Sequence, residues 1–103
     1  MSERNDYKFA DELLKKLGIK FQRKVWKNNK REVSDGIPDY IIPIDNGKTI
    51  WIEWKSIGKT NNLNDKQKDW QQYLITNRHD YYIVDNFYSF INILKTHGLI
   101  KED

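Results

Sequence analysis

The sequence predicts an α/β domain with a central mixed sheet of about four strands flanked by helices. Three observations support this prediction. An amphipathic helical pattern opens the chain, short apolar strands joined by turns follow it, and a helix, a strand and a final helix complete it. The expected order is αβββαβ with a C-terminal helix. Because 103 residues is a usual size for one domain, we expect residues 1–103 to form a single unit.

The first helix is predicted over residues 4–17, and Gly18 is a natural stop after it. Its apolar side chains recur at helical spacing: Tyr7, Ala10, Leu13, Leu14 and Leu17. Residues 19–26 alternate between apolar and polar side chains, which indicates a strand. Polar or glycine-containing segments at 28–31 and 35–38 indicate turns.

A β-hairpin is predicted in the middle of the chain. Residues 39–44 form its first strand, in which Pro43 marks an edge position or a bulge because proline cannot donate to a ladder. Asn46-Gly47 is a strong hairpin turn, and residues 49–55 form the second strand. A polar loop at 58–62 follows it.

The remaining chain predicts a helix, a strand and a helix. Asn64 is a suitable N-cap with Gln67 three residues later, as in a capping box, so a helix is predicted from there to about residue 76. The side chains predicted on its inner side are Trp70, Tyr73 and Leu74. Residues 81–84 indicate a core strand, and the last helix is expected over 87–97.

Composition narrows the class of protein. Hydrophobic residues make up 38% and charged residues 32% of the chain, with a mean hydropathy of −0.88, which indicates a folded, water-soluble protein. No apolar run approaches the roughly 18 residues of a membrane span, and no signal peptide is recognisable. With no cysteine and two histidines, any metal is expected to be bound by oxygen, as Mg²⁺ or Mn²⁺ prefers. No organic cofactor is expected.

The net charge of +3 is concentrated in one basic segment. Its cations occur with no acid among them: Lys20, Arg23, Lys24, Lys27, Lys30 and Arg31. Such a cluster suits the phosphate backbone of a nucleic acid. A solvated strand pair or loop is the alternative interpretation.

Three charged groups are predicted to meet at one end of the hairpin. Glu53 and Lys55 lie two residues apart on a strand and so share one face, about 7 Å apart. The hairpin brings Asp39 close to position 54. Two carboxylates with the backbone carbonyl of Trp54 could hold a hard cation, and Lys55 could orient a nucleophile or neutralise a transition state. The alternative is a Pro-Asp turn and a surface Glu–Lys pair.

Gln67 is a fourth candidate, because it is a polar residue on an otherwise apolar helical stripe. The stripe comprises Leu63, Gln67, Trp70 and Leu74. The glutamine either caps the start of the helix or reaches into a polar site, and both can hold at once.

These residues resemble a known family. Gly36-Ile37-Pro38-Asp39, Ile52-Glu53-Trp54-Lys55 and the helix with Gln67, Trp70 and Leu74 are similar to the VRR-NUC branch of the PD-(D/E)XK nuclease superfamily. The resemblance runs from the first helix to the 82–84 strand and implies a restriction-endonuclease-like core. One departure is the bulky Trp54 between Glu53 and Lys55, whose side chain is expected to point into the core.

The resemblance implies a Mg²⁺- or Mn²⁺-dependent DNA endonuclease of bacterial or phage origin, active in the cytoplasm of the bacterium or infected host. It implies a homodimer that cuts branched DNA such as four-way junctions. The family places a glutamate in the first helix about fifteen residues before a glycine. Glu3 fits that position before Gly18, and Glu12 is the alternative. The loop after the lysine implies a phosphate contact for Lys59.

Two other functions compete with the nuclease. A DNA-binding module that retains the nuclease fold without its chemistry would use the basic segment and Lys59 and need no metal. A structural or protein-interaction domain would use the aromatic residues as a core and a contact face, but it leaves the clustered acids unexplained. A dimer surface is predicted on the C-terminal helix, with Phe87, Tyr88, Phe90 and Ile91.

Overall fold

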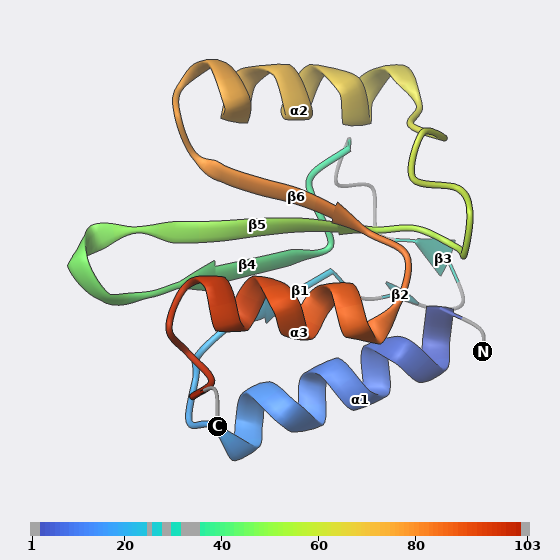
Figure 1. Cartoon of the computed structure of the whole chain (residues 1–103). Helices are drawn as coiled ribbons and strands as arrows, with labels where there is room; N and C mark the ends of the chain where they lie inside the picture. The colour runs from blue at the N-terminus through green and yellow to red at the C-terminus, as the bar shows by residue number, and fades with distance from the viewer. Residues whose placement is uncertain (1–2, 25, 28–29, 32–35, 102–103) are drawn as a thin grey trace.

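The computed structural model of the chain is shown in Figure 1, and it describes residues 3–24, 26–27, 30–31 and 36–101. The helices are α1 (Glu3–Lys16), α2 (Asp65–Thr76) and α3 (Phe87–Thr96), with a short 3₁₀ turn, η1 (Asp45–Gly47). The strands are β1 (Gln22–Arg23), β2 (Trp26–Lys27), β3 (Lys30–Arg31), β4 (Tyr40–Pro43), β5 (Thr49–Trp54) and β6 (Asp80–Val84).

The central sheet has four strands in the order β1-β4-β5-β6. β1 pairs with β4 and β4 with β5 in antiparallel fashion, whereas β5 and β6 are parallel because α2 forms the crossover between them. Figure 1 shows α2 on one face of this sheet and α1 with α3 on the other. The predicted mixed four-strand α/β fold is therefore confirmed.

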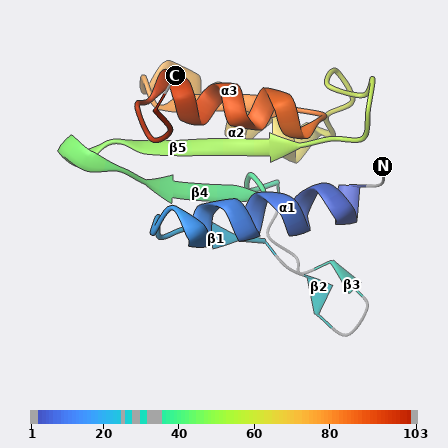
Figure 2. The same cartoon turned by 60° about the horizontal axis from the view of Figure 1, so that its bottom comes forward.

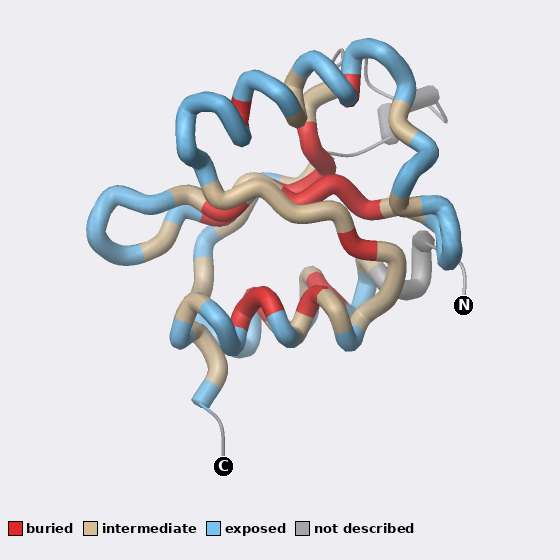
Figure 3. The backbone as a smooth tube through the Cα atoms, turned by 45° about the horizontal axis from the view of Figure 1, so that its top comes forward, coloured by how far each residue is buried: buried red, intermediate tan, exposed pale blue. Residues whose placement is uncertain are grey.

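The main core lies between the sheet and the α1–α3 layer. Strand β5 supplies Ile50, Ile52 and Trp54 to it, each at most 1% exposed, because alternate residues of a strand share a face. The other core residues come from both helices and from strands β4 and β6: Ala10, Leu14, Tyr40, Ile42, Val84, Phe90, Ile93 and Leu94. Figure 3 shows the buried backbone running along the middle of the sheet and the inward sides of the helices.

The hairpin between β4 and β5 sets the register of the site. Tyr40 pairs with Ile52 and Pro43 with Thr49. The turn is closed by a 2.8 Å bond from the Ile44 N–H to the Lys48 carbonyl. Asn46 adopts φ 66°, a left-handed conformation that asparagine tolerates, and Gly47 adopts φ 72°. Pro43 is exposed and lies beyond the residues that β1 pairs with, which confirms its edge position.

Strand structure in the basic segment differs from the prediction. The strand expected over 19–26 is two short strands, because β1 joins the main sheet while β2 pairs with β3 in a separate ribbon. Lys30 and Arg31, expected in a turn, form β3. Figure 2 shows this ribbon projecting away from the main sheet.

Two aromatic residues also lie elsewhere than predicted. Tyr73 is 61% exposed, because α2 packs on the sheet through Gln67, Trp70 and Leu74 and leaves Tyr73 edge-on to Trp70. Phe90, predicted on a dimer surface, is fully buried, with its ring 5.4 Å from that of Trp54.

No helix among the described residues is long and apolar enough to cross a membrane.

Candidate active site at the end of the β4–β5 hairpin

Asp39 immediately precedes β4 and lies against the end of β5. Since Tyr40 pairs with Ile52, Asp39 falls opposite Glu53. The Trp54 N–H donates a 2.7 Å hydrogen bond to Asp39 Oδ2, and Asp39 is 5% exposed. The N–H and C=O of one strand residue point to the same side, so the Trp54 carbonyl also faces the Asp39 strand. The predicted proximity of Asp39 to position 54 is confirmed.

Glu53 lies on the opposite face of β5 from the core tryptophan Trp54 and is 1% exposed. Gln67 Nε2 donates a long, 3.5 Å hydrogen bond to Glu53 Oε2. Burial raises the pKa of Glu53 to about 9, with further contributions from a hydrogen bond with Asp39 and the charge of that carboxylate. Lys24 and Lys55 act in the opposite direction. At Glu53, burial and the neighbouring Asp39 therefore outweigh the charges of the two lysines.

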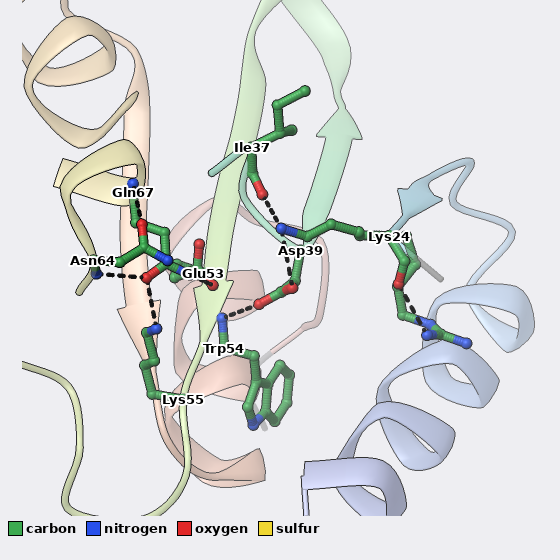
Figure 4. A network of polar contacts seen from close by, with 9 residues as sticks. Lys24, Ile37, Asp39, Glu53, Trp54, Lys55, Asn64 and Gln67 are labelled. Carbon is green, nitrogen blue, oxygen red and sulfur yellow. Dashed lines mark hydrogen bonds and ion pairs between the residues drawn. The ribbon is translucent and has the colours of Figure 1, made fainter. Parts of the chain in front are cut away.

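Lys55 and Gln67 form the other side of the site. Lys55 Nζ donates a 2.9 Å hydrogen bond to Gln67 Oε1, and the Asn64 N–H donates a 3.0 Å bond to the same oxygen. The Gln67 N–H donates back to Asn64 Oδ1 at 2.9 Å, which completes the capping box. Gln67 thus both caps α2 and contacts Glu53 and Lys55, as Figure 4 shows.

Gly36 brings the segment before Asp39 against the start of α2. A Cβ atom at Gly36 would lie 2.6 Å from the Gln67 nitrogen and closer still to the Lys66 carbonyl group, and φ there is +86°. Both the contact and the conformation require glycine. The motif Gly36-Ile37-Pro38-Asp39 therefore packs on the same helical turn that supplies Gln67. The sequence alone does not reveal that Gly36 lies against the backbone of Lys66 and Gln67.

Two basic residues expected to contact DNA have partners inside the protein. Arg23 Nε donates to Asp11 Oδ2 at 2.8 Å, and Tyr40 Oη donates to Asp11 Oδ1 at 2.5 Å. Lys24 Nζ donates to the Ile37 carbonyl at 2.5 Å and lies 3.9 Å from Asp39 Oδ1. Neither side chain presents its cation freely on the surface. These partners are remote in sequence, so the charge run alone could not reveal them.

The other predicted contacts are spread more widely. Lys20 and Lys59 are exposed, as is Glu12. The side chains of Lys27, Lys30, Arg31 and Glu3 lie outside what the structure describes. Figures 1 and 2 place the beginning of α1, where Glu3 stands, at the same end of the molecule as the end of β5.

The loop that carries Lys59 is tied to the end of β6. The Gly58 N–H donates a 2.9 Å hydrogen bond to Asp85 Oδ2. This bond, with a second from the Asn86 side chain, holds the pKa of Asp85 below its usual value. The Lys59 N–H closes a turn onto the Ser56 carbonyl at 2.9 Å. Lys59 therefore projects from an anchored turn a few residues after Lys55. The spacing of residues in the sequence did not indicate that Asp85 anchors this turn.

The donor set at this site suits a hard divalent cation. Asp39, Glu53 and the Trp54 carbonyl supply oxygen atoms, the ligands that Mg²⁺ and Mn²⁺ prefer, and water can complete the coordination. A bound cation would add positive charge to that of Lys24 and Lys55 and so favour the ionised form of both acids. The described residues contain no group of three or more His, Cys, Asp and Glu placed to hold a metal. The described part of the chain thus supplies two carboxylates to this candidate metal site.

The mixed sheet, its helical layers and the acid–x–lysine strand define a nuclease-type domain of the PD-(D/E)XK superfamily. The sequence model of the VRR-NUC domain matches residues 2–86, and the chain belongs to this family. A solved structure described as a VRR_NUC domain superposes with a TM-score of 0.64 at 20% sequence identity, covering 92% of this chain and 95% of that chain. That likeness shows the fold. No curated protein matches the sequence.

Proposed function

We propose that this VRR-NUC domain is a Mg²⁺- or Mn²⁺-dependent endonuclease that hydrolyses phosphodiester bonds in DNA. The observation that carries the proposal is the buried pair Asp39–Glu53 beside a lysine, Lys55, that Gln67 holds in place. Burying two adjacent acids costs free energy, which a structural role alone does not explain. Such arrangements are typical of sites that bind a cation and act on charged substrates.

Each residue has a proposed role. Asp39, Glu53 and the Trp54 carbonyl would hold the ion, with Glu3 as a further acid at the start of α1. When bound, the ion would lower the pKa of a water molecule and stabilise charge on the scissile phosphate. Lys55 would orient the attacking water or stabilise the negative charge that develops. Gln67 would keep Lys55 in position through Oε1.

The DNA backbone would be bound by basic side chains around this site. Lys20 and Lys59 are exposed and suited to phosphate. Lys27, Lys30 and Arg31 are proposed for the same role. We further propose a homodimer, since symmetric cutting of a four-way junction needs two sites related by a two-fold axis. Tyr88, 79% exposed on α3, is the candidate contact. The proposed setting is the cytoplasm of a bacterium or a phage-infected cell.

Cleavage of a labelled DNA panel tests this function. The panel contains single-stranded, linear duplex, supercoiled, flap and four-way junction DNA, each with Mg²⁺, Mn²⁺ or chelator. Glu53→Gln should abolish cutting, whereas Asp69→Asn, which removes an exposed carboxylate on α2, should not. Cutting that persists in Glu53→Gln would refute the assignment. The preferred DNA form would give the substrate class, and the solution mass would give the oligomeric state.

A non-catalytic DNA-binding module is the second candidate. It is favoured by the fact that the described residues supply two carboxylates and no third acidic or histidine ligand beside them. Salt-dependent DNA binding without cutting on any form or with any metal would establish it.

A further inference from the structure

We propose that Lys24 is an internal positioning residue that fixes the Ile37–Asp39 segment and its carboxylate, and that it does not contact DNA. The inference rests on the proposed function in that Asp39 is taken as part of the active site. It reassigns a residue that the sequence places within a run of surface cations.

Lys24 holds this segment at three points. Its backbone N–H donates a 2.8 Å bond to the Asp39 carbonyl. Its Nζ donates a 2.5 Å bond to the Ile37 carbonyl and lies 3.9 Å from Asp39 Oδ1. Figure 4 shows the Lys24 side chain extending from the side of β1 to these atoms. The backbone and the side chain of Lys24 thus bind the carbonyl oxygens on either side of Pro38.

Burial shows that this is an inward-facing lysine. The Lys24 side chain is 8% exposed and that of Asp39 is 7% exposed. A desolvated ammonium is stable only beside hydrogen-bond acceptors and an opposite charge, and the Ile37 carbonyl and Asp39 supply both. A phosphate contact would require the ammonium to leave these partners.

The backbone of Lys24 is also held in place, on the side that faces α1. The neighbouring Arg23 is bound to Asp11 of α1 at 2.8 Å, and its Nη1 donates to the Lys24 carbonyl at 3.3 Å. The position of Lys24 is therefore defined both by the helix behind it and by the segment in front. Such a support determines the orientation of Asp39, because Oδ2 accepts from the Trp54 N–H while Oδ1 is directed to the ammonium.

The two lysines flank the acid pair in equivalent ways. Lys24 is held by the Ile37 carbonyl and Lys55 by Gln67 Oε1, each by a neutral oxygen on a different element. Lys24 thus supports the Asp39 side as Gln67 and Lys55 support the Glu53 side. A loss of either support should lower the rate of the chemical step rather than the affinity for DNA.

The test compares Lys24→Met with Lys20→Met, which removes an exposed cation four residues earlier. For Lys24→Met we expect kcat at saturating DNA to fall roughly 10- to 100-fold. Its Kd for DNA in chelator, and the slope of log Kd against log salt, should match the wild type. For Lys20→Met we expect weaker DNA binding and a slope smaller by about one.

A second readout needs no DNA. The Mn²⁺ concentration that gives half of the maximal thermal stabilisation should rise at least about threefold in Lys24→Met, because Asp39 is no longer held in place. A purely electrostatic role would lower this concentration, because a competing positive charge is lost. Lys20→Met should leave it unchanged.

The outcomes separate the two proposals. If the wild type cuts no DNA and is not stabilised by Mn²⁺, the proposed function fails, and the DNA-binding comparison still decides the role of Lys24. If Lys24→Met loses DNA affinity and salt dependence as Lys20→Met does, the inference is overturned. Circular dichroism melting checks folding, and Lys24→Gln, which keeps a donor for the Ile37 carbonyl, replaces Lys24→Met if that variant does not fold.

Discussion

The Trp54 N–H donates a 2.7 Å hydrogen bond to the carboxylate of Asp39, 15 residues earlier in the chain. The bond extends the β4–β5 ladder by one side-chain contact beyond its last paired residues. It gives Asp39 a structural role in addition to the proposed role at the metal. The two roles can be separated, because the bond needs an oxygen acceptor whereas metal binding needs the charge.

Replacing Asp39 by asparagine should remove activity and keep the fold. Asparagine retains an oxygen that accepts from the Trp54 N–H. It removes the charge beside Lys24 but also the repulsion of Glu53, so the free energy of unfolding should stay within roughly 1 kcal/mol of the wild type. Cleavage should fall at least roughly 100-fold, because the charge is lost. Asp39→Leu also leaves a buried N–H without an acceptor and should cost about 1–3 kcal/mol more. Denaturant unfolding and cleavage rates measure both. Equal stability of the two variants would contradict the structural role.

The stability of the metal-free protein should fall as the pH rises. The pKa of Glu53 is raised in the folded state from 4.5 to about 9, so between these values the folded protein keeps a proton that the unfolded chain has released. Folding free energy is therefore lost progressively with rising pH across this window. Glu53→Gln should remove this part of the slope and should be more stable than the wild type near the upper end. Mn²⁺ should offset the loss in the wild type and not in the variant. Urea midpoints across the pH range give the comparison, and parallel profiles for the two proteins would refute it.

Gly36 should tolerate no side chain. Alanine there would adopt a left-handed conformation and press on the backbone of Lys66 and Gln67, so we expect a loss of roughly 2–4 kcal/mol from strain and overpacking. Gly98 is the matched control, because it has φ +73° and a Cβ atom there would meet nothing within 4 Å. Gly98→Ala should cost only about 1–2 kcal/mol. Thermal melts of both variants check this difference, and similar losses would mean that the contact with α2 is unimportant.

Asn64 and Gln67 allow the cap to be separated from the site. Asn64→Ala removes the cap acceptor and should cost about 1 kcal/mol with little change in cleavage. Gln67→Ala removes the cap partner, the acceptor of Lys55 and a donor to Glu53, so cleavage should also fall roughly 100-fold. The comparison uses kcat together with the unfolding free energy. If both variants lose activity in proportion to their stability, Gln67 acts as a cap alone.

Local patterns predicted the parts of the site that lie on single elements. The period of two along residues 49–55 correctly separated Glu53 and Lys55 from the core residues Ile52 and Trp54. The spacing of Asn64 and Gln67 correctly predicted the capping box. Each inference needed only the geometry of one strand or one helical turn.

Long-range partners were beyond those patterns. Lys24 belongs to a run of cations whose members look equivalent in sequence, but its ammonium turns inward because the segment around Ile37 passes beside it. Arg23 is bound to Asp11 for a similar reason. The predicted position of Tyr73 was wrong, because α2 lies on one face of the sheet and buries a narrower stripe of side chains than its aromatic content suggested. In each case the tilt and packing of separate elements decide the outcome.

The antiparallel pairing of β4 with β5 has a consequence for how the chain folds. This hairpin joins residues close in sequence, whereas the parallel pairing of β5 with β6 must first close a loop that contains α2. Local pairings generally precede distant ones during folding, so the two acids should meet before α2 brings in Gln67 to hold Lys55. At this step Glu53 must take up a proton or meet the charge of Asp39, and proton uptake costs more free energy as the pH rises. Refolding without metal should be faster at pH 5 than at pH 8, and stopped-flow fluorescence of the tryptophans would measure the ratio. Equal rates would place the meeting of the two acids after the rate-limiting step.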